Sequence, residues 1–379
     1  MKKVAVVNRT NLKNFGSVLQ CYALCEVISQ MGYESEILWE QGNVSKNFDF
    51  RPVKITKTLL KLLTHPRLLK STLKNVKEIK GKPISEDTIQ LFEKFVQTHI
   101  RQKLMSHKEL VNVARSDIYS KFVCGSDQIW CSTTTYVDPL MYLRFAPESK
   151  RIAYAPSIGR DYVPDYNRRQ MKKYIKEIPY VSIREVEGQR LVKELTGRDV
   201  PVVLDPTLLI EKEKWDLIKI NTVEPKPYLL CYFLDVPHEK MQRNIEKCAI
   251  ENNLTIISLG RELEYINNEV KMLAPDCGPA EFLGYVSEAE MVVTDSYHGM
   301  LFSTIYEKEF WSVERAYNQF DQSSRQKTVL KMLDLESRYI SSTEEFEFKE
   351  TDIDYSHVRA VLEKKKMDSI EYLATAIEK

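Results

Sequence analysis

Short apolar runs alternate with helix-patterned stretches from the start of the chain. Lys3–Val7 is apolar, residues 17–31 repeat apolar side chains at helical spacing, and residues 33–39 are apolar again. Gly32 stands just after the helical stretch, where a glycine commonly ends a helix. Strand, helix and strand in this order predict a βαβ unit and therefore a parallel sheet.

The same alternation continues along the chain. The apolar runs expected to extend the first sheet, and those expected to form a second βαβαβ half, lie at residues 122–124, 151–155, 180–183 and 202–204, and at 228–234, 254–258 and 291–293. Between the two groups, residues 211–227 are charged and carry two prolines near their end, as expected of a linker. The charged amphipathic tail, residues 353–379, is expected to cross back onto the first domain.

Length supports two domains, because 379 residues exceed the roughly 250–300 at which single cores tend to split. We predict an α/β fold with a first domain at residues 1–210, a second at 211–350 and a C-terminal helix at 351–379. The formal net charge of +1 gives no overall attraction to nucleic acid or membrane. No leader-like or membrane-spanning apolar run is visible, and seven cysteines suit reduced thiols. We therefore expect a cytoplasmic protein.

Residues 51–82 depart from this balanced charge. They hold ten lysines and arginines against one acid, Glu78, with leucines interleaved. One interpretation is a basic surface that meets an anionic acceptor or the anionic inner face of a membrane. The other is a solvated helical excursion between two strands.

Polar turns follow several of the apolar runs, and the first begins at Asn14. In the sequence NFGSVLQ, Gly16 can adopt a positive φ and leaves backbone N–H groups open at a helix N-terminus, which suits an anion or a sugar oxygen. Gln20 ends this stretch. The pattern is neither GxGxxG nor a P-loop, and a simple tight turn explains it equally well.

A second turn contains Gly125, Ser126, Asp127 and Gln128, with Trp130 nearby. A hydroxyl, a carboxylate and an amide beside an aromatic ring suit a sugar, because polar groups hold its hydroxyls while the ring packs on its face. The alternative is a helix N-cap, where serine and aspartate are favoured.

Two further positions suggest acid–base and anion chemistry. Arg184 directly follows an apolar run, where a guanidinium can grip a carboxylate or phosphate, unless it simply pairs with Glu185. His298 lies in a polar turn that we expect to be exposed, within MVVTDSYHGMLFS, and can act as acid, base or phosphate ligand. Asp295 and Ser296 are placed to orient its ring or to cap the next helix.

Metal chemistry finds little support in the sequence. Cys21 and Cys25 are four residues apart, but no paired Cys/His set accompanies them, so we interpret them as small core residues. Asp127, Asp205 and Asp295 are scattered, and there is no GxSxG elbow for acyl transfer.

Taken together, the motifs resemble the polysaccharide pyruvyl transferase family. The segments that carry the resemblance, in the family's order, are NFGSVLQCYAL, FVCGSDQIW, RIAYAPSIG, VSIREVEGQRL, VVLDPTLLI and VVTDSYHGMLFSTIYEKEF, followed by Ser323-Ser324-Arg325. The resemblance implies two Rossmann-like domains facing a cleft, as in GT-B glycosyltransferases. It also implies transfer of pyruvate from phosphoenolpyruvate to a pair of sugar hydroxyls, forming a ketal and releasing phosphate.

The resemblance also implies roles for residues. Phosphoenolpyruvate would be a co-substrate, with no metal or further cofactor, and the residues expected around it are Arg184, Ser296, His298, Gly299 and Arg325. The residues expected on the acceptor side are Asn14, Gly16, Gln20, Gly125, Ser126, Gln128 and Trp130. His298 and Asp127 are the expected catalytic pair, with acid and base left open between them.

The sequence departs from the family pattern at one position. Some members carry an arginine two residues before the histidine, where this chain has Ser296, so Arg325, Arg315 or Lys308 would have to complete the anion site. Two other functions stay open at this point. One is a GT-B glycosyltransferase that uses a nucleotide sugar, and the other is a non-catalytic glycan-binding protein.

Overall fold

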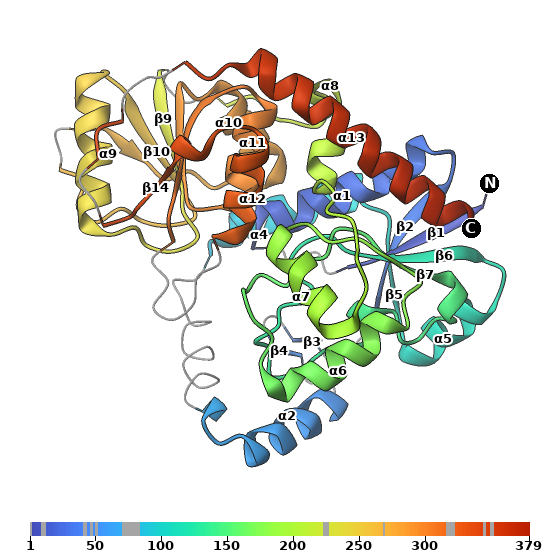
Figure 1. The fold of residues 1–379 in the computed structure, drawn as a ribbon. Coiled ribbons are helices and arrows are strands. Elements are labelled where there is room, and N and C mark those ends of the chain that lie inside the picture. Colours follow the sequence, from blue (N-terminus) through green and yellow to red (C-terminus); the bar gives the residue numbers. More distant parts are fainter. Residues whose placement is uncertain are drawn as a thin grey trace.

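Two parallel six-stranded sheets organise the molecule (Figure 1). The computed structural model describes residues 2–8, 13–40, 44–45, 48–49, 52–69, 84–222, 227–267, 270–315, 323–343, 346–348 and 352–379. The second half of the basic segment, residues 70–82, therefore lies outside the described residues. Within the described part of the chain, no helix has the length and apolar character needed to cross a membrane.

The first sheet has the strand order β5-β2-β1-β6-β7-β8, and all its neighbouring strands are parallel. Its strands are β1 (Lys3–Val7), β2 (Glu34–Glu40), β5 (Gln102–Met105), β6 (Tyr119–Cys124), β7 (Arg151–Ala153) and β8 (Tyr180–Val181). The predicted parallel sheet is confirmed. The sequence did not predict β5, whose two central residues are exposed, because an edge strand lacks a continuous apolar pattern.

The second sheet repeats this arrangement, with the order β11-β10-β9-β12-β13-β14. Its strands are β9 (Tyr228–Tyr232), β10 (Thr255–Leu259), β11 (Met272–Leu273), β12 (Met291–Thr294), β13 (Glu309–Val313) and β14 (Tyr339–Ile340). In each sheet the first strand in the chain lies near the middle. The second and third strands lie on one side of it, and the fourth, fifth and sixth strands lie on the other side. The order reverses between β1 and β6 and between β9 and β12, where doubly wound sheets bind ligands.

Helices cover both sheets and join them. Their bounds are α1 (Phe15–Gln30), α2 (Pro52–Thr64), α4 (Glu86–His99), α5 (His107–Arg115), α6 (Asp165–Lys176), α7 (Val186–Thr196), α8 (Lys212–Asp216), α9 (Glu239–Glu251), α10 (Pro279–Glu288), α11 (Tyr297–Ile305), α12 (Ser324–Met332) and α13 (Tyr355–Glu378). A separate hairpin pairs β3 (Val44–Ser45) with β4 (Phe48–Asp49). The candidate linker is not structureless, since it contains α8 and the fully buried Trp215.

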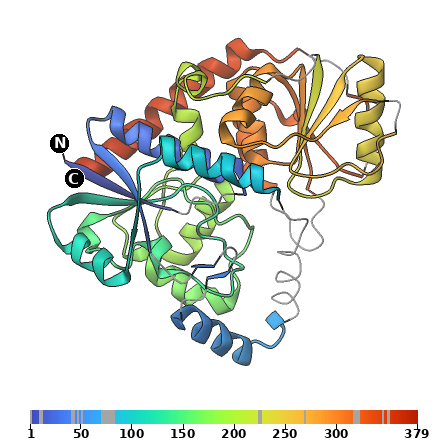
Figure 2. The same ribbon diagram turned by 180° about the vertical axis from the view of Figure 1, so that it is seen from behind.

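Apolar packing fills the space between the two sheets. The Phe15 ring at the start of α1 stacks on Phe92 of α4 at 5.2 Å and on Phe282 of α10 at 4.7 Å. One continuous core contains side chains from both sheets and from these helices. The view from behind shows α1 and α4 lying between the two halves (Figure 2).

The last helix, α13, runs along both halves of the molecule (Figure 1). Tyr355 near its start donates to the carbonyl of Lys308, and Ser369 further along accepts from the backbone N–H of Leu204 at 3.0 Å. The residue bounds that we predicted for the domains remain a prediction. The proposed break at residue 210 falls between the strands of the first sheet and those of the second.

Candidate active site

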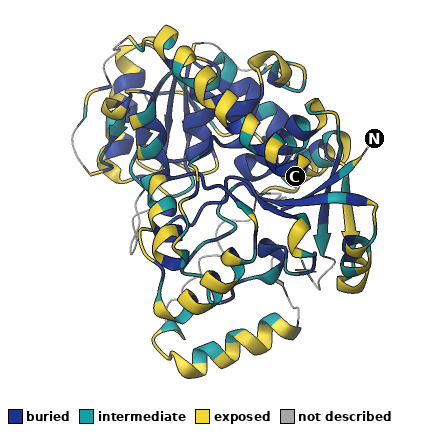
Figure 3. Ribbon diagram, turned by 45° about the vertical axis from the view of Figure 1, so that its right-hand side comes forward, coloured by how far each residue is buried: buried dark blue, intermediate teal, exposed yellow. Residues whose placement is uncertain are grey.

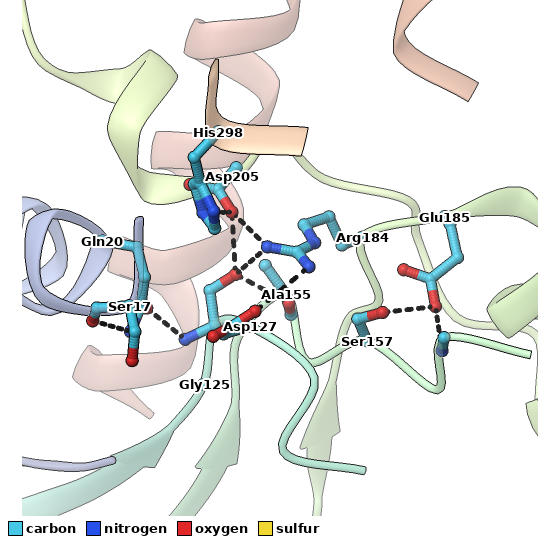
Figure 4. Close-up of polar contacts among 12 residues, drawn as sticks. Ser17, Gln20, Gly125, Asp127, Ala155, Ser157, Arg184, Glu185, Asp205 and His298 are labelled. Atoms are coloured by element: carbon cyan, nitrogen blue, oxygen red, sulfur yellow. Dashed lines mark hydrogen bonds and ion pairs between the residues drawn. The ribbon is translucent and has the colours of Figure 1, made fainter. Parts of the chain in front are cut away.

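The carboxyl ends of strands from both sheets meet at one buried cluster (Figure 4). The turn after β6 supplies Ser126 and Asp127, and Arg184 follows β8. The second sheet contributes His298, in the first turn of α11 after β12. Asp205 lies at the start of a short 3-10 helix, Pro206–Leu209, and completes the cluster.

Arg184 is at the centre of this cluster and is only 2% exposed. Its Nη1 donates to Asp205 Oδ2 at 2.5 Å, and its Nη2 lies 3.6 Å from Asp127 Oδ1. Burial disfavours the charged guanidinium, but Tyr297, Asp205 and Asp127 outweigh burial and raise the pKa of Arg184. The alternative of a surface Arg–Glu pair is wrong, because Glu185 Oε1 instead accepts from Ser157 and from two backbone N–H groups of the neighbouring loop.

Asp205 links side chains from both sheets. Its Oδ2 lies 3.1 Å from Ser126 Oγ and 3.6 Å from His298 Nε2, besides its contact with Arg184. Its Oδ1 accepts from the backbone and the hydroxyl of Thr207. Burial alone would raise the pKa of Asp205, but His298, Arg184 and Thr207 together hold it well below its ordinary value. Asp205 is therefore a buried carboxylate in the middle of cationic and polar partners.

His298 packs against the backbone of α1. A Cβ placed on Gly16 would come within 2.0 Å of His298 Nδ1, so only glycine leaves room for the ring. The expectation of an exposed histidine is wrong, since His298 is 5% exposed. Gly16 itself lies in the first turn of α1 rather than in a positive-φ turn. The sequence pattern identified both residues, but only the fold brings them together.

Tyr297 and Arg325 extend the cluster on the side of the second sheet. The Arg184 guanidinium lies 4.3 Å from the centre of the Tyr297 ring, and that of Arg325 lies 5.7 Å from it. Arg325 is buried on α12, which packs against α7. Two guanidinium groups thus lie within cation–π distance of one aromatic ring.

Several buried donors of this cluster have no hydrogen bond to any described residue. These atoms are Arg184 Nε and Nη2, His298 Nε2 and the Tyr297 hydroxyl. Arg184 Nη2 and His298 Nε2 each lie 3.6 Å from a carboxylate oxygen, of Asp127 and Asp205, which is within ion-pair distance but too long for a hydrogen bond. Buried polar atoms are normally satisfied, and those that are not call for a functional explanation such as a ligand. Because the unsatisfied atoms include a guanidinium and an imidazole, the site suits an anion with several oxygen atoms.

Asp127 differs from its neighbours in being accessible. Its side chain is 26% exposed, and its φ of 64° holds it in the left-handed region at the turn after β6. Gly125, two residues earlier, has a φ of 125°, and a Cβ there would come within 1.9 Å of the Tyr154 carbonyl oxygen. The tight backbone path thus presents the Asp127 carboxylate beside Arg184.

Residues at the start of α1 contact the residues of the cluster and hold the turn after β6 in place. Asn14 caps α1 by accepting from Ser17 N at 3.0 Å. Gln20 is fully buried, and its Oε1 accepts from Ser126 N at 3.0 Å and from Asn8 Nδ2 at 3.3 Å. Asn8, which the sequence did not single out, also donates to the carbonyl of Gly125. The structure therefore gives Asn14 and Gln20 a supporting place rather than an open surface for an acceptor.

The remaining predicted acceptor residues Ser126, Gln128 and Trp130 lie in different surroundings. Ser126 is fully buried within the cluster and lies 3.0 Å from the Ala155 carbonyl. Gln128 is partly buried and packs beside Gly159. Trp130 lies in the core, where its ring stacks on Tyr142 at 5.0 Å and its Nε1 donates to the Met141 carbonyl. Its ring is thus covered by protein and has no free face for a sugar.

Two further predicted residues form the start of α11. Ser296 is its N-cap and accepts from the backbone N–H of Gly299 at 3.3 Å. Asp295 does not orient His298; its carboxylate accepts from Leu234 N at 2.6 Å and Asp235 N at 3.0 Å. Burial raises the pKa of Asp295 to about 6, and Arg315 and the two backbone donors only partly oppose this.

The other suggested anion ligands lie apart from the cluster. Arg315 pairs with Asp235 at 2.9 Å and lies 3.7 Å from Asp295. Lys308 donates to the Ser287 carbonyl at 3.2 Å. Of the candidates to complete the anion site, only Arg325 reaches the Tyr297 ring. The described residues include no group of three or more histidine, cysteine or acidic side chains placed to hold a metal ion.

Sequence reasoning missed Asp205 and Tyr297 as site residues. Asp205 follows an apolar run, as the other turns do, but a carboxylate before a proline also fits a simple strand stop. Tyr297 precedes His298 and looks like an apolar helix residue. Asp205 and Tyr297 can be identified as site residues only in the folded structure. There the segments that contain Asp205 and His298, about 90 residues apart in the chain, come together.

Comparisons with solved structures bear on the fold. The chain is similar in fold to Arabidopsis thaliana UGT89C1 complexed with UDP-L-rhamnose, with a TM-score of 0.53 and 10% identity over 100% of both chains. A UDP-GlcNAc 2-epimerase from Neisseria meningitidis bound to UDP-GlcNAc matches with a TM-score of 0.49 and 12% identity, over 100% of this chain and 93% of that one. The two parallel sheets and the likeness to the Arabidopsis thaliana structure show a GT-B-like pair of Rossmann-like domains.

The match at the level of sequence is more specific than the fold. A comparison with curated proteins found no match. The family model of polysaccharide pyruvyl transferases matches residues 14–317, which include the turns after β6 and β12, Arg184 and Asp205. The chain therefore belongs to the polysaccharide pyruvyl transferase family.

Proposed function

We propose that this protein transfers pyruvate from phosphoenolpyruvate onto two hydroxyls of one sugar, in a polysaccharide or its lipid-linked precursor. The observation that carries the proposal is the buried group of unsatisfied donors on Arg184, Tyr297 and His298. Phosphoenolpyruvate bears a carboxylate and a phosphate, and preorganised donors in a site shielded from water bind such charges strongly.

The reaction forms two C–O bonds at one carbon, the first by addition and the second by displacement of phosphate. The first sugar hydroxyl forms a bond to C2 of phosphoenolpyruvate while the methylene carbon takes up a proton and becomes a methyl group. The second hydroxyl then bonds to the same carbon as the C2–O bond to phosphate breaks. Of the two hydroxyl protons, one balances the proton gained by the methyl group and the other leaves with phosphate. The product is a cyclic ketal.

The positions of the side chains suggest a division of labour. In this proposal Arg184 and Arg325 hold the two anionic groups, with the Tyr297 hydroxyl as a further donor. Asp127 accepts the proton of the incoming hydroxyl, because it is the accessible carboxylate of the cluster. His298 then supplies the proton to the methylene carbon, with Asp205 holding its ring in place from 3.6 Å.

The compartment and partners follow from the same proposal. We place the protein in the cytoplasm, where phosphoenolpyruvate is made, with glycan precursors at the inner face of the membrane as its acceptors. All seven cysteines are thiols, which suits a reducing compartment. No metal or further cofactor has a role in the scheme.

Calorimetric titration with phosphoenolpyruvate tests the donor. We expect binding by the wild type and loss of at least about tenfold in affinity for Arg184→Ala and for His298→Ala. Arg190→Ala is the matched control, because Arg190 lies on α7 close by in sequence but pairs with Glu187 and Glu194 at the surface. It should bind as the wild type does.

Parallel titrations with UDP and a UDP-sugar separate the alternatives. Binding of the nucleotide in place of phosphoenolpyruvate would identify a glycosyltransferase and overturn the proposal. Phosphoenolpyruvate binding without phosphate release in the presence of lipid-linked glycans from a cell envelope would point instead to a protein that binds but does not transfer.

A further inference from the structure

Helix α2 presents apolar side chains to solvent. Leu63 is 77% exposed and Leu60 64%, and Val53 and Leu59 are each 56% exposed. The side facing the protein instead includes Lys61, whose Nζ donates to Asn167 Oδ1 at 2.6 Å and lies 5.3 Å from the centre of the Tyr166 ring. A surface helix normally buries its apolar face, so this orientation is inverted. The outward apolar face indicates a partner.

The position of α2 leaves this face accessible. The helix projects from the first domain, on the side away from the second sheet (Figures 1 and 2). Coloured by burial, it is exposed over most of its length (Figure 3). An apolar surface this concentrated is uncommon on a soluble protein without a binding role.

Charge identifies the kind of partner. Residues 52–69, which the structure describes, contain three lysines and one arginine and no acid. Lys57 and Arg67 are exposed beside the leucines. Leucines with flanking lysines and arginines match the boundary of an anionic bilayer, where acyl chains accept the apolar face and lipid phosphates attract the cations. An apolar protein groove would satisfy the leucines but not the charge.

A cavity beside the helix has the same chemistry. It measures about 300 Å³ and lies between α2 and the first domain. Its described lining includes Lys57, Lys61 and His65, together with Tyr136 and Tyr166, and no carboxylate. Such a cavity suits the phosphate of a lipid headgroup next to the leucine face.

We propose that α2 is a docking helix that lies in the surface of an anionic lipid bilayer, with Val53, Leu59, Leu60 and Leu63 inserted. Its 13 residues give a length of about 20 Å, which suits a helix lying along the interface rather than across the membrane. Docking needs no catalytic activity. Its consequence, that the active site is held near lipid-linked glycans, rests on the proposed function.

Sedimentation of the full chain with lipid vesicles tests the docking. We expect binding to vesicles of phosphatidylcholine with phosphatidylglycerol, and at least about tenfold weaker binding to phosphatidylcholine alone or in high salt. The double variant Leu60→Ser/Leu63→Ser should lose at least about tenfold in partitioning. Because both side chains are exposed, its thermal unfolding should match the wild type. Leu217→Ser, which removes a lone leucine that is 78% exposed, should bind as the wild type does.

Charge reversal tests the contribution of the basic side chains to docking. Lys57→Glu/Arg67→Glu should weaken binding to anionic vesicles several-fold, whereas Lys240→Glu/Lys271→Glu, on exposed positions of the second domain, should not. Equal binding of the wild type and the leucine variant would overturn the proposal, as would failure of the wild type to sediment with anionic vesicles. A dimer that forms at micromolar concentration and is lost in the leucine variant would assign the face to a second copy of the chain instead. Phosphoenolpyruvate titration of the same variants distinguishes loss of docking from loss of the active site.

Discussion

Asp205 is the residue on which the geometry of the cluster depends most directly. It lies within 3.6 Å of Ser126, Arg184 and His298, which come from two different sheets. A carboxylate is required at this position because Arg184 is buried and carries a charge that burial alone would disfavour. Asp205 thus stabilises the guanidinium whose remaining donors face the substrate in our proposal.

Substitution Asp205→Asn should lower the free energy of unfolding by about 3–5 kcal/mol, because it leaves a buried guanidinium without its closest anionic partner. Urea denaturation measures this loss. The matched control is Asp199→Asn, whose side chain is 74% exposed and pairs with Lys193 at the surface, and it should change stability by less than about 0.5 kcal/mol. Equal effects of the two substitutions would show that the Asp205 contact is not formed.

Gly16→Ala should weaken phosphoenolpyruvate binding at least about tenfold, since the new methyl group would come within 2.0 Å of His298 Nδ1 and displace the ring. Alanine favours the helix by about 1 kcal/mol over glycine, so helix propensity works against any global destabilisation. Gly32→Ala provides the contrast. Its φ of 87° costs about 1–2 kcal/mol for alanine, but nothing lies within 4 Å of the added carbon. It should reduce stability without reducing affinity, as titration and denaturation of both variants would reveal.

At the scale of elements, the site depends on where the strands end. In each sheet the first and fourth strands are neighbours and the chain order reverses between them, so the carboxyl ends of these two strands are the points at which doubly wound sheets bind ligands. Asp295 fixes one of these points, because it follows β12 and accepts from the backbone N–H groups of Leu234 and Asp235 after β9. The equivalent tie in the first sheet is Asn8, which follows β1 and donates to the Gly125 carbonyl after β6.

The buried carboxyl of Asp295 gives a pH-dependent stability. Its pKa of about 6 in the folded protein is above the ordinary value of 3.8, so folding takes up a proton between these two values. The contribution is complete below pH 3.8 and is lost as the pH rises through 6. A shift of this size corresponds to roughly 3 kcal/mol. The difference in unfolding free energy between wild type and Asp295→Asn should therefore fall by about that amount from pH 4 to pH 7. A constant difference in urea denaturation across this range would contradict the assignment, and Asp161→Asn at the surface serves as control.

At the scale of the whole molecule, the two sheets share one core. Phe15 of α1 contacts Phe92, Phe282 and Tyr232, so an apolar interface joins the two halves of the molecule. The predicted pair of Rossmann-like domains is confirmed, and the buried cluster lies where the carboxyl ends of their two sheets meet. Packing of this kind holds Arg184 and His298 in fixed relative positions.

The C-terminal helix adds to this coupling. Leu373 is fully buried and belongs to the core that contains side chains of both sheets. Leu373→Ala should therefore lower the free energy of unfolding by about 2–5 kcal/mol in a single cooperative transition. Met367→Ala, at a position that is 64% exposed on the same helix, should change it by less than about 0.5 kcal/mol. Two separate transitions in the Leu373 variant would indicate that the halves unfold independently.

The amino-acid sequence by itself determined the class of fold and singled out several of the polar residues that the structure gathers into one cluster. Apolar runs of strand length followed by helical spacing indicate parallel sheets, because each pattern buries one face of its own element and depends only on local order. The polar turns after those runs marked Asp127, Arg184 and His298, which the structure brings to one cluster. Edge strands such as β5 escaped prediction, because their partly exposed residues lack that pattern.

The tertiary structure alone decided which polar residues share a site. Asp205 and Tyr297 became site residues, whereas Trp130 became a core residue, because burial and pairing depend on segments far apart in the chain. The need for a glycine at position 16 is visible only in the folded structure, where the His298 ring approaches it. The same holds for α2, whose composition suggested a basic surface. Its orientation on the first domain decides that leucines face outward, since which face of a helix is covered is set by its neighbours and not by its own sequence.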